Sequence, residues 1–166
     1  MKTQTITIER TLHLPLNTVW KAFSEPESLM KWWGPKDYTC PQFTNNFQTG
    51  GKYLGAMKNK NGKLTWSTGV YTEIIQNKRI AMTDSFSDSN GNILSGSLVG
   101  MPGEWPDELL ITLEFQEHED TTLLLLIHEG LPPERYEDCI HGWQESFDKL
   151  ENIFKYLRET SNSLEE

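Results

Sequence analysis

Hydrophobic and polar residues alternate at the start of the chain. The apolar residues there stand an even number of positions apart, at Ile6, Ile8, Leu12 and Leu14. This period of two is typical of a strand with one buried face. Pro15 ends the pattern, because proline has no backbone N–H to donate to a neighbouring strand. We therefore expect the first element to be a half-buried strand.

Two short helices are predicted next. In the segment "LNTVWKAF", Val19, Trp20 and Phe23 fall on one helical face, and Asn17 is a suitable N-cap. In "SEPESLMKWWG", Pro26 suits the first turn of a helix, where its missing N–H costs nothing. The two segments are short and adjacent, so we expect a pair of small helices between the first strand and the second.

The second helix ends at the sequence "KWWGP". Gly34 suits the left-handed position that follows a helix, and the proline after it cannot continue the helix. Neighbouring helical side chains point about 100° apart, so Trp32 and Trp33 cannot share a direction. We expect one ring to pack beneath the short helices and the other to lie at a cavity rim. The spacing of Met30 and Trp33 favours Trp33 as the ring that faces inward.

Strand patterns separated by turn residues occupy the middle of the chain. The segments "TCPQFTNNF" and "TGGKYLGAMK" precede a turn at residues 59–62, and "KLTWSTGVYTEII" and "KRIAMTDSFS" join at Gln76 and Asn77. A turn at residues 89–92 then leads into residues 93–107, which are rich in Gly, Pro and Ser and predict a long loop.

Two final strands, "ELLITLEFQE" and "TTLLLLIHEG", precede a long helix. Apolar residues recur every three or four positions in "YEDCIHGWQESFDKLENIFKYL", so we expect helix over residues 134–158. This order of elements favours one α+β domain, with a curved antiparallel sheet of six to seven strands and helices on one face. We place the domain at residues 1–160 and expect a flexible polar tail at residues 161–166.

Composition narrows the classes of partner. The formal net charge of -9 opposes binding to nucleic-acid phosphates and to anionic lipid. No apolar run is long enough to cross a membrane, and the N-terminus lacks the apolar core of a signal peptide. We therefore expect a cytoplasmic protein without a nucleic-acid partner and without membrane insertion. Cys40 and Cys139 are far apart and are expected to be reduced thiols.

Candidate catalytic chemistry is sparse. The sequence contains no phosphate-binding loop, nucleophile elbow or zinc-protease motif, and its four histidines lack metal-ligand spacing. We expect no cofactor and no metal. For His128, at the end of an apolar strand, we favour satisfaction by a backbone carbonyl or solvent over a polar handle in a cavity. Asp84 is either a buried polar group or the exposed end of its strand, and His141 fits a solvated helix face.

Five segments of the chain occur in the order of one family. They are "PLNTVWKAFSEPESLMKWWGP", "TGGKY", "GVYTEIIQNKRIAMT", "ITLEFQEHEDTTLLLLIHEGLP" and "HGWQESFDKLENIF". With them the chain resembles the bacterial domains similar to the activator of heat-shock-protein-90 ATPase, within the START-like, Bet v-like superfamily of polyketide cyclases, dehydrases and lipid-transport proteins. The resemblance covers residues 4–157. Its most specific parts are the VW…WWGP opening, the G-x-Y-x-E-I strand and the GW of the last helix.

The resemblance implies a helix-grip fold, in which a curved sheet holds the long C-terminal helix around an apolar cavity. It also implies binding of lipids, polyketides or plant-type phenolics, which members of the superfamily bind. Residues 93–105 form a longer connection than the resemblance leads us to expect, and this segment would cover the cavity mouth as a lid. The eukaryotic co-chaperone that names the family has two domains, whereas we expect a single domain here, which weakens the co-chaperone interpretation.

We therefore favour binding of a small hydrophobic or aromatic ligand, such as a lipid, polyketide or flavonoid-like molecule, over two alternatives. The first is a chaperone-associated stress-response module that activates an ATPase through its surface, and the second is a cyclase or hydrolase. For each candidate wall residue the alternative is plain core packing. We expect a monomer or weak dimer. The candidate ligand-binding residues are Trp33, Trp66, Tyr71, Met82, Phe86, His128, Trp143 and Phe147.

Overall fold

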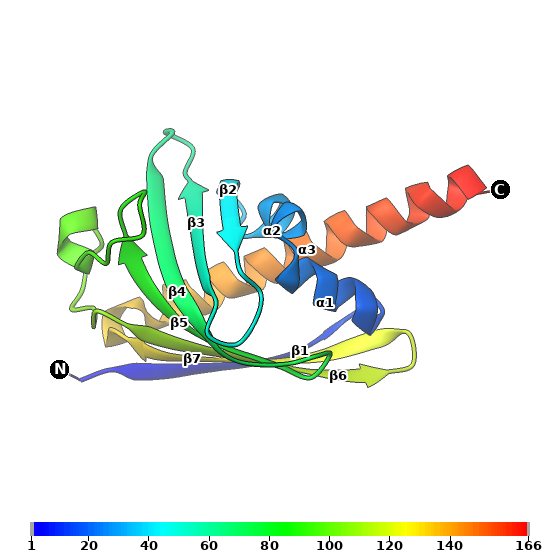
Figure 1. Cartoon of the computed structure of the whole chain (residues 1–166), viewed down its shortest axis with the longest axis horizontal. Coiled ribbons are helices and arrows are strands. Elements are labelled where there is room, and N and C mark those ends of the chain that lie inside the picture. The colour runs from blue at the N-terminus through cyan, green and yellow to red at the C-terminus, as the bar shows by residue number, and fades with distance from the viewer. Residues whose placement is uncertain (1, 166) are drawn as a thin grey trace.

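The structure is a computed structural model that describes residues 2–165, with side chains for residues 2–161. Seven strands and three α-helices follow one another within this range (Figure 1). Their order is β1 (Gln4–Leu12), α1 (Leu16–Ser24), α2 (Pro26–Trp32), β2 (Thr39–Asn45), β3 (Lys52–Lys58), β4 (Leu64–Ile75), β5 (Arg79–Ser87), β6 (Leu109–His118), β7 (Thr121–Leu131) and α3 (Tyr136–Glu165). Short 3-10 turns lie at Gly96–Val99 and Pro133–Arg135.

The strands form one antiparallel sheet in the order β1-β7-β6-β5-β4-β3-β2. Figure 1 shows this sheet bending around the first half of α3, whose second half projects beyond the sheet toward the C-terminus. The predicted α+β architecture is therefore confirmed: a curved antiparallel sheet grips a long C-terminal helix, and two short helices follow the first strand.

The sheet bends along β5, which joins the half made of β1, β7 and β6 to the half made of β4, β3 and β2. Thr83 and Asp84 pair with Leu110 and Leu109 of β6. On the β4 side, the backbone N–H of Val70 donates to the Thr83 hydroxyl instead of to a backbone carbonyl. A Cβ on Gly69 would lie 2.0 Å from the Thr83 carbonyl oxygen, so only glycine permits this approach. The bend turns Asp84 toward the hollow of the sheet, beside α3.

Burial identifies the inward face of each strand. Both faces of the "LLLLI" run in β7 are apolar, so its periodicity alone does not assign them. In the structure Leu124, Leu126 and His128 are buried, together with Ile111 and Leu113 of β6. They pack toward α3, from which the buried side chains are Phe147, Leu150 and Phe154. The core therefore lies between the concave face of the sheet and the helix.

Helix boundaries differ from the prediction at the start of α1 and at both ends of α3, which runs to Glu165 instead of residue 158. Asn17 is not the N-cap of α1. That position is Pro15, whose carbonyl accepts the backbone N–H groups of Thr18 and Val19. The long helix begins at Tyr136 instead of residue 134, because a 3-10 turn occupies Pro133–Arg135. Of the expected tail at residues 161–166, the backbone is helical through residue 165, and residue 166 lies outside the described residues.

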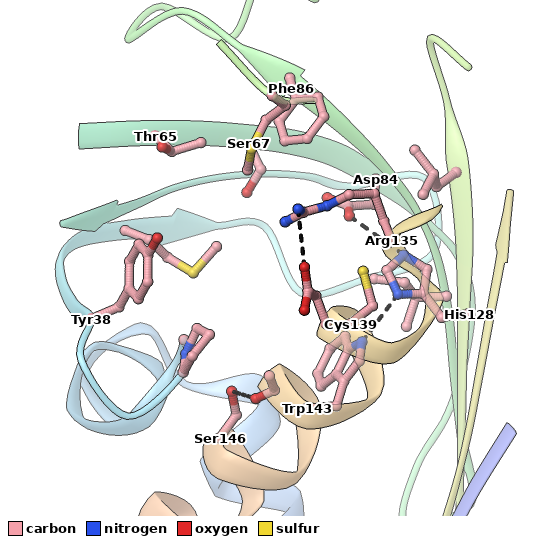
Figure 2. A pocket seen from close by; sticks show the side chains of 18 of the residues that line it. Tyr38, Thr65, Ser67, Asp84, Phe86, His128, Arg135, Cys139, Trp143 and Ser146 are labelled. Carbon is pink, nitrogen blue, oxygen red and sulfur yellow. Dashed lines mark hydrogen bonds and ion pairs between the residues drawn. The ribbon is translucent and has the colours of Figure 1, made fainter. Parts of the chain in front are cut away.

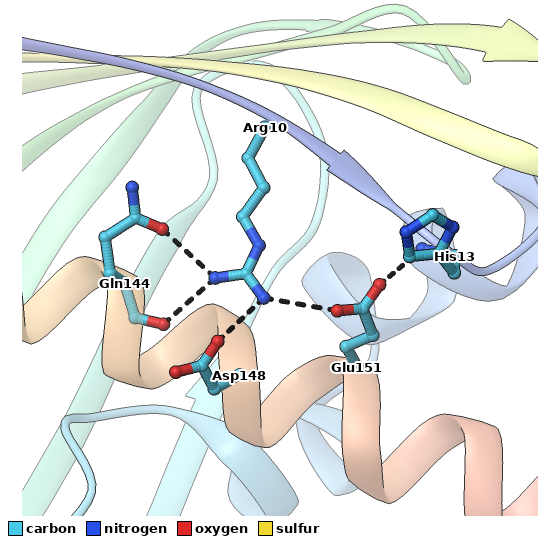
Figure 3. A network of polar contacts seen from close by, with 5 residues as sticks. All are labelled: Arg10, His13, Gln144, Asp148 and Glu151. Atoms are coloured by element: carbon cyan, nitrogen blue, oxygen red, sulfur yellow. Dashed lines mark hydrogen bonds and ion pairs between the residues drawn. The ribbon is translucent and has the colours of Figure 1, made fainter.

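Arg10 joins the edge strand β1 to α3 (Figure 3). It lies on the inward face of β1, on the same side as Ile8 and Leu12, and its side chain is only 20% exposed. Its guanidinium donates to the backbone carbonyl and the side-chain oxygen of Gln144, and to Asp148 and Glu151. The network also includes the residue after β1, because the second carboxylate oxygen of Glu151 accepts the backbone N–H of His13.

We predict that Arg10→Met lowers the free energy of unfolding by about 2–3 kcal/mol, because Glu151 is 16% exposed and loses its cation. Urea unfolding measures this loss. Adding Glu151→Gln to Arg10→Met should recover part of it, since the unpaired charge is then removed. The control is Lys60→Met, which removes the exposed Lys60–Asp37 pair, with side chains 72% and 55% exposed. Lys60→Met should lower the free energy of unfolding by less than about 0.5 kcal/mol. Equal midpoints for Arg10→Met and Lys60→Met would contradict this role.

Candidate functional site

A partly enclosed cavity of about 240 Å³ lies between the bent half of the sheet and the first turns of α3 (Figure 2). Its wall comes from β3 to β7, from the turn after α2, from the loop before β6 and from α3. Most of the wall is apolar. The larger apolar side chains that line it are Trp33, Met57, Phe86, Trp105, Ile111 and Trp143.

Four of the eight candidate residues meet in this cavity. Trp33, Phe86, His128 and Trp143 come from four different elements of the chain and all line its wall. The rings of Trp33 and Trp143 meet edge to face, with centroids 5.7 Å apart. The imidazole of His128 meets the indole of Trp143 edge to face, with ring centroids 5.8 Å apart. The structure thus brings together half of the residues that the sequence singled out.

The other four candidates lie outside the cavity lining. Trp66 alternates with Thr65 and Ser67, which do line the cavity, so its side chain projects from the opposite face of β4. The remaining three lie deeper in the core, where neighbouring rings and aliphatic side chains fill the space around them. These three are Tyr71, Met82 and Phe147.

The two neighbouring tryptophans have different surroundings, as expected. Trp32 is fully buried, and its indole N–H donates to the carbonyl of Ala22 over 2.8 Å. Trp33 is the extended residue after α2 and lines the cavity. The spacing argument from Met30 was nevertheless wrong: Met30 is exposed, and Trp33 lies beyond the last helical residue. The direction of Trp33 comes instead from the chain reversal at Gly34, whose φ is +106°.

Small side chains create the space that the aromatic rings surround. Thr65, Ser67 and Ser85 line the cavity at positions where larger residues would fill it. These residues carry no motif, so the sequence analysis did not identify them. The available signal was the alternation of Thr65 and Ser67 with Trp66, which places the two smaller residues together on one face of β4.

Two loops complete the rim of the cavity. Trp105, from the predicted loop at residues 93–107, contacts Phe86 edge to face at 5.1 Å and donates its indole N–H to the Pro102 carbonyl. On the other side, the ammonium group of Lys149 in α3 donates to the carbonyls of Pro35 and Tyr38, over 3.2 and 2.9 Å. Neither Trp105 nor Lys149 carries a sequence signal that points to a cavity.

His128 is the central polar group of the cavity. Its side chain is 9% exposed, and its Nδ1 accepts the indole N–H of Trp143 over 3.0 Å. The expectation that a backbone carbonyl or solvent satisfies this histidine was therefore wrong. The inward face of β7 carries His128 into the cavity, beside the helix. Burial lowers the pKa of His128 to about 4, so the ring is neutral at neutral pH.

The bond from Trp143 fixes the tautomer of His128. An indole nitrogen can only donate, so Nδ1 must be the unprotonated nitrogen and Nε2 carries the hydrogen. Nε2 has no hydrogen-bond partner. Its nearest polar neighbour is Oδ2 of Asp84, 3.9 Å away, which is beyond hydrogen-bond distance. A buried donor therefore faces the cavity without a partner.

Asp84 lies opposite His128 as a cavity-lining polar group, which settles the choice between its two interpretations. Its side chain is 26% exposed. Its Oδ1 lies 3.1 Å from the hydroxyl of Tyr53, which also lies 2.8 Å from the Thr83 carbonyl. Burial raises the pKa of Asp84 to about 6, and the Tyr53 bond opposes this rise. Figure 2 shows Asp84, His128 and Arg135 gathered at one side of the cavity, away from Tyr38.

Arg135 is the charged donor nearest to this polar end. Its Nη1 contacts Asp138 at 3.1 Å, whereas its Nε is buried without a hydrogen-bond partner. Burial raises the pKa of Cys139 to about 11, so this thiol is protonated at neutral pH and is a weak nucleophile. His141 is exposed and lies 3.8 Å from Glu145, as expected for a solvated helix face. Within the described residues, no group of three or more His, Cys, Asp or Glu side chains forms a metal site.

Comparison with known proteins gives a family match over most of the chain. The family described as "Activator of Hsp90 ATPase homolog 1-like protein" matches residues 13–155. No curated protein matches the sequence. Among the described helices, none is long and apolar enough to span a membrane.

Solved structures share the fold across nearly their whole length. A protein from Chromobacterium violaceum is 26% identical, with 90% of this chain and 96% of that chain covered and a TM-score of 0.75. A protein from Nitrosomonas europaea is 21% identical, with 93% and 96% covered and a TM-score of 0.76. The AHSA1 protein from Silicibacter pomeroyi is 19% identical, with 92% and 99% covered and a TM-score of 0.74.

The two titrating groups of the cavity should give opposite pH dependences of stability. Between pH 3.8 and 6 the folded state holds a proton on Asp84 that the unfolded state lacks, so this contribution falls as pH rises. Between pH 4 and 6.5 the unfolded state holds a proton on His128 that the folded state lacks, so this contribution rises with pH. The two contributions oppose each other between pH 4 and 6.

Single substitutions should separate the contributions of Asp84 and His128. The difference in unfolding free energy between Asp84→Asn and wild type should rise between pH 4 and pH 6, by at most about 1.4 kcal/mol per pH unit. The corresponding difference for His128→Gln should fall over the same range. Urea unfolding at half-unit pH steps measures both slopes. Two variants with the same slope as wild type would show that neither group titrates as its burial requires.

Proposed function

The chain belongs to the family of activator of Hsp90 ATPase homolog 1-like proteins, and from this premise we propose that it binds a small, mainly apolar ligand in the cavity beside α3. The cavity itself is the observation that supports the proposal. Protein interiors normally pack at the density of organic crystals, so a space of about 240 Å³ with an opening is an exception to ordinary core packing. Concave apolar spaces with a few polar groups are typical ligand sites.

The lining supports an aromatic or flat aliphatic ligand. Trp33 and Trp143 meet edge to face on one side, and Phe86 and Trp105 do so on another. Such rings provide large apolar surface and favour flat partners through offset or edge-to-face contacts. Pockets for drug-sized molecules usually have volumes of about 300–1,000 Å³. The smaller volume here favours a ligand, or part of one, with one or two rings.

Intrinsic tryptophan fluorescence gives a direct test, because the indoles of Trp33, Trp105 and Trp143 belong to the wall. We expect saturable changes on titration with a panel of one-ring and two-ring aromatic compounds and short-chain lipids. Ser67→Phe fills the cavity from β4 and should weaken the best ligand at least tenfold. Thr72→Phe adds the same ring at an exposed position of the same strand and should leave binding unchanged.

Two outcomes would contradict this function. The first is that no member of the panel binds the wild-type protein. The second is that Ser67→Phe binds as tightly as wild type, which would place the ligand elsewhere. Chromatography of the recovered ligand belongs to the same experiment, because an unchanged ligand distinguishes a binding protein from a cyclase or hydrolase.

The family description favours a second candidate, a chaperone-associated module that activates an ATPase through its surface. An assay of the bacterial heat-shock-protein-90 homologue with and without the protein tests it. Stimulation of ATP turnover that Ser67→Phe retains would support a surface role independent of the cavity. Unchanged turnover at a saturating excess of the protein would remove this candidate.

A further inference from the structure

At the polar end of the cavity, His128 and Asp84 present a donor and an acceptor that do not reach each other, beside the guanidinium of Arg135, which pairs with Asp138. His128 presents Nε2–H, which has no hydrogen-bond partner although the side chain is more than nine-tenths buried. Asp84 presents Oδ2, 3.9 Å from that nitrogen. Both residues line the cavity. Buried donors without partners are rare in folded proteins, so this one points to a group that the cavity receives.

Hydrogen bonds to neighbouring side chains hold the orientation of both groups. Trp143 donates to Nδ1 of His128, which keeps the hydrogen on Nε2 and directs it toward Asp84. Tyr53 lies within hydrogen-bond distance of Oδ1 of Asp84, which leaves Oδ2 for the cavity. A ligand therefore meets a donor and an acceptor whose positions are set before it binds.

The separation of 3.9 Å suits one oxygen atom placed between the two groups. Hydrogen bonds of ordinary length, about 2.8 Å on each side, would meet at such an atom with an angle near 90°. A hydroxyl group accepts from Nε2–H and donates to the carboxylate at the same time. An ether or carbonyl oxygen can accept from His128 but cannot donate to Asp84.

We propose that the cavity selects a ligand whose apolar body ends in a hydroxyl group, an aromatic phenol or alcohol, and that this hydroxyl bridges Nε2 of His128 and Oδ2 of Asp84. The inference rests on the proposed function and adds the chemical class of the ligand. In Figure 2, Asp84 and His128 lie at one side of the cavity, and Tyr38 and Thr65 lie at the other. A ligand bound in this way would place its hydroxyl at the first side and its ring system toward the second.

Three two-ring probes test this class: 2-naphthol, 2-methoxynaphthalene and naphthalene. Their dissociation constants are measured by tryptophan fluorescence at pH 8, where Asp84, with a pKa of about 6, is ionised. We expect 2-naphthol to bind wild type at least tenfold more tightly than either of the others, because only its hydroxyl both donates and accepts. In Asp84→Leu and in His128→Phe this preference should fall to about twofold or less.

Naphthalene serves as the control for the variants, since it makes no hydrogen bond. Retained naphthalene binding by Asp84→Leu and His128→Phe shows that the cavity is intact. The wild-type comparison of three probes needs no substitution, so it decides the question even where a variant fails to fold. Equal affinity of wild type for 2-naphthol and naphthalene would overturn the hydroxyl bridge and leave the apolar site standing, as expected where water alone occupies the polar end. Absence of binding by all three would overturn both proposals.

Discussion

The position of α3 across the concave face of the sheet is the constraint on which the rest of the structure depends. Arg10 of the edge strand β1 holds one side of the helix through Gln144, Asp148 and Glu151. The fully buried side chains of Phe147 and Leu150 hold its middle. Nearer its start, Trp143 donates to His128 of β7. The cavity is the space left between this fixed helix and the strands that bend away from it at β5.

The same constraint gives the cavity its chemistry. Because the helix places Trp143 against Nδ1 of His128, the opposite nitrogen of that ring must donate into the cavity. The bend in β5 sets Asp84 across from it. A neutral donor and an acidic acceptor then face the same end of a mostly apolar cavity, beside the Arg135–Asp138 pair. Family membership alone does not choose between a ligand-binding protein and a chaperone-associated one, whereas this arrangement favours the former.

The sequence predicted the elements well because their signals are local. Periodicity gave the strands and the long helix, and the Gly34–Pro35 reversal separated Trp32 from Trp33. The site was predicted only in part, because its members depend on contacts between distant segments. For His128 a backbone carbonyl or solvent was the expected partner, whereas its partner is Trp143, fifteen residues later in the chain and on another element. Thr65 and Ser67 define the space by being small, a property that no motif records. Tyr71, Met82 and Phe147 share the aromatic or apolar character of the wall, but they fill the core.

The most direct measurement of the central claim is the NMR response of the indole N–H signals of the six tryptophans to a saturating aromatic ligand. Trp33 and Trp143 line the cavity, whereas Trp32 is fully buried against Ala22 and Trp66 projects from the other face of β4. The account predicts large shifts for Trp33 and Trp143 and small ones for Trp32 and Trp66. Shifts confined to Trp66, or no shift at Trp33 and Trp143 with a ligand that demonstrably binds, would contradict it.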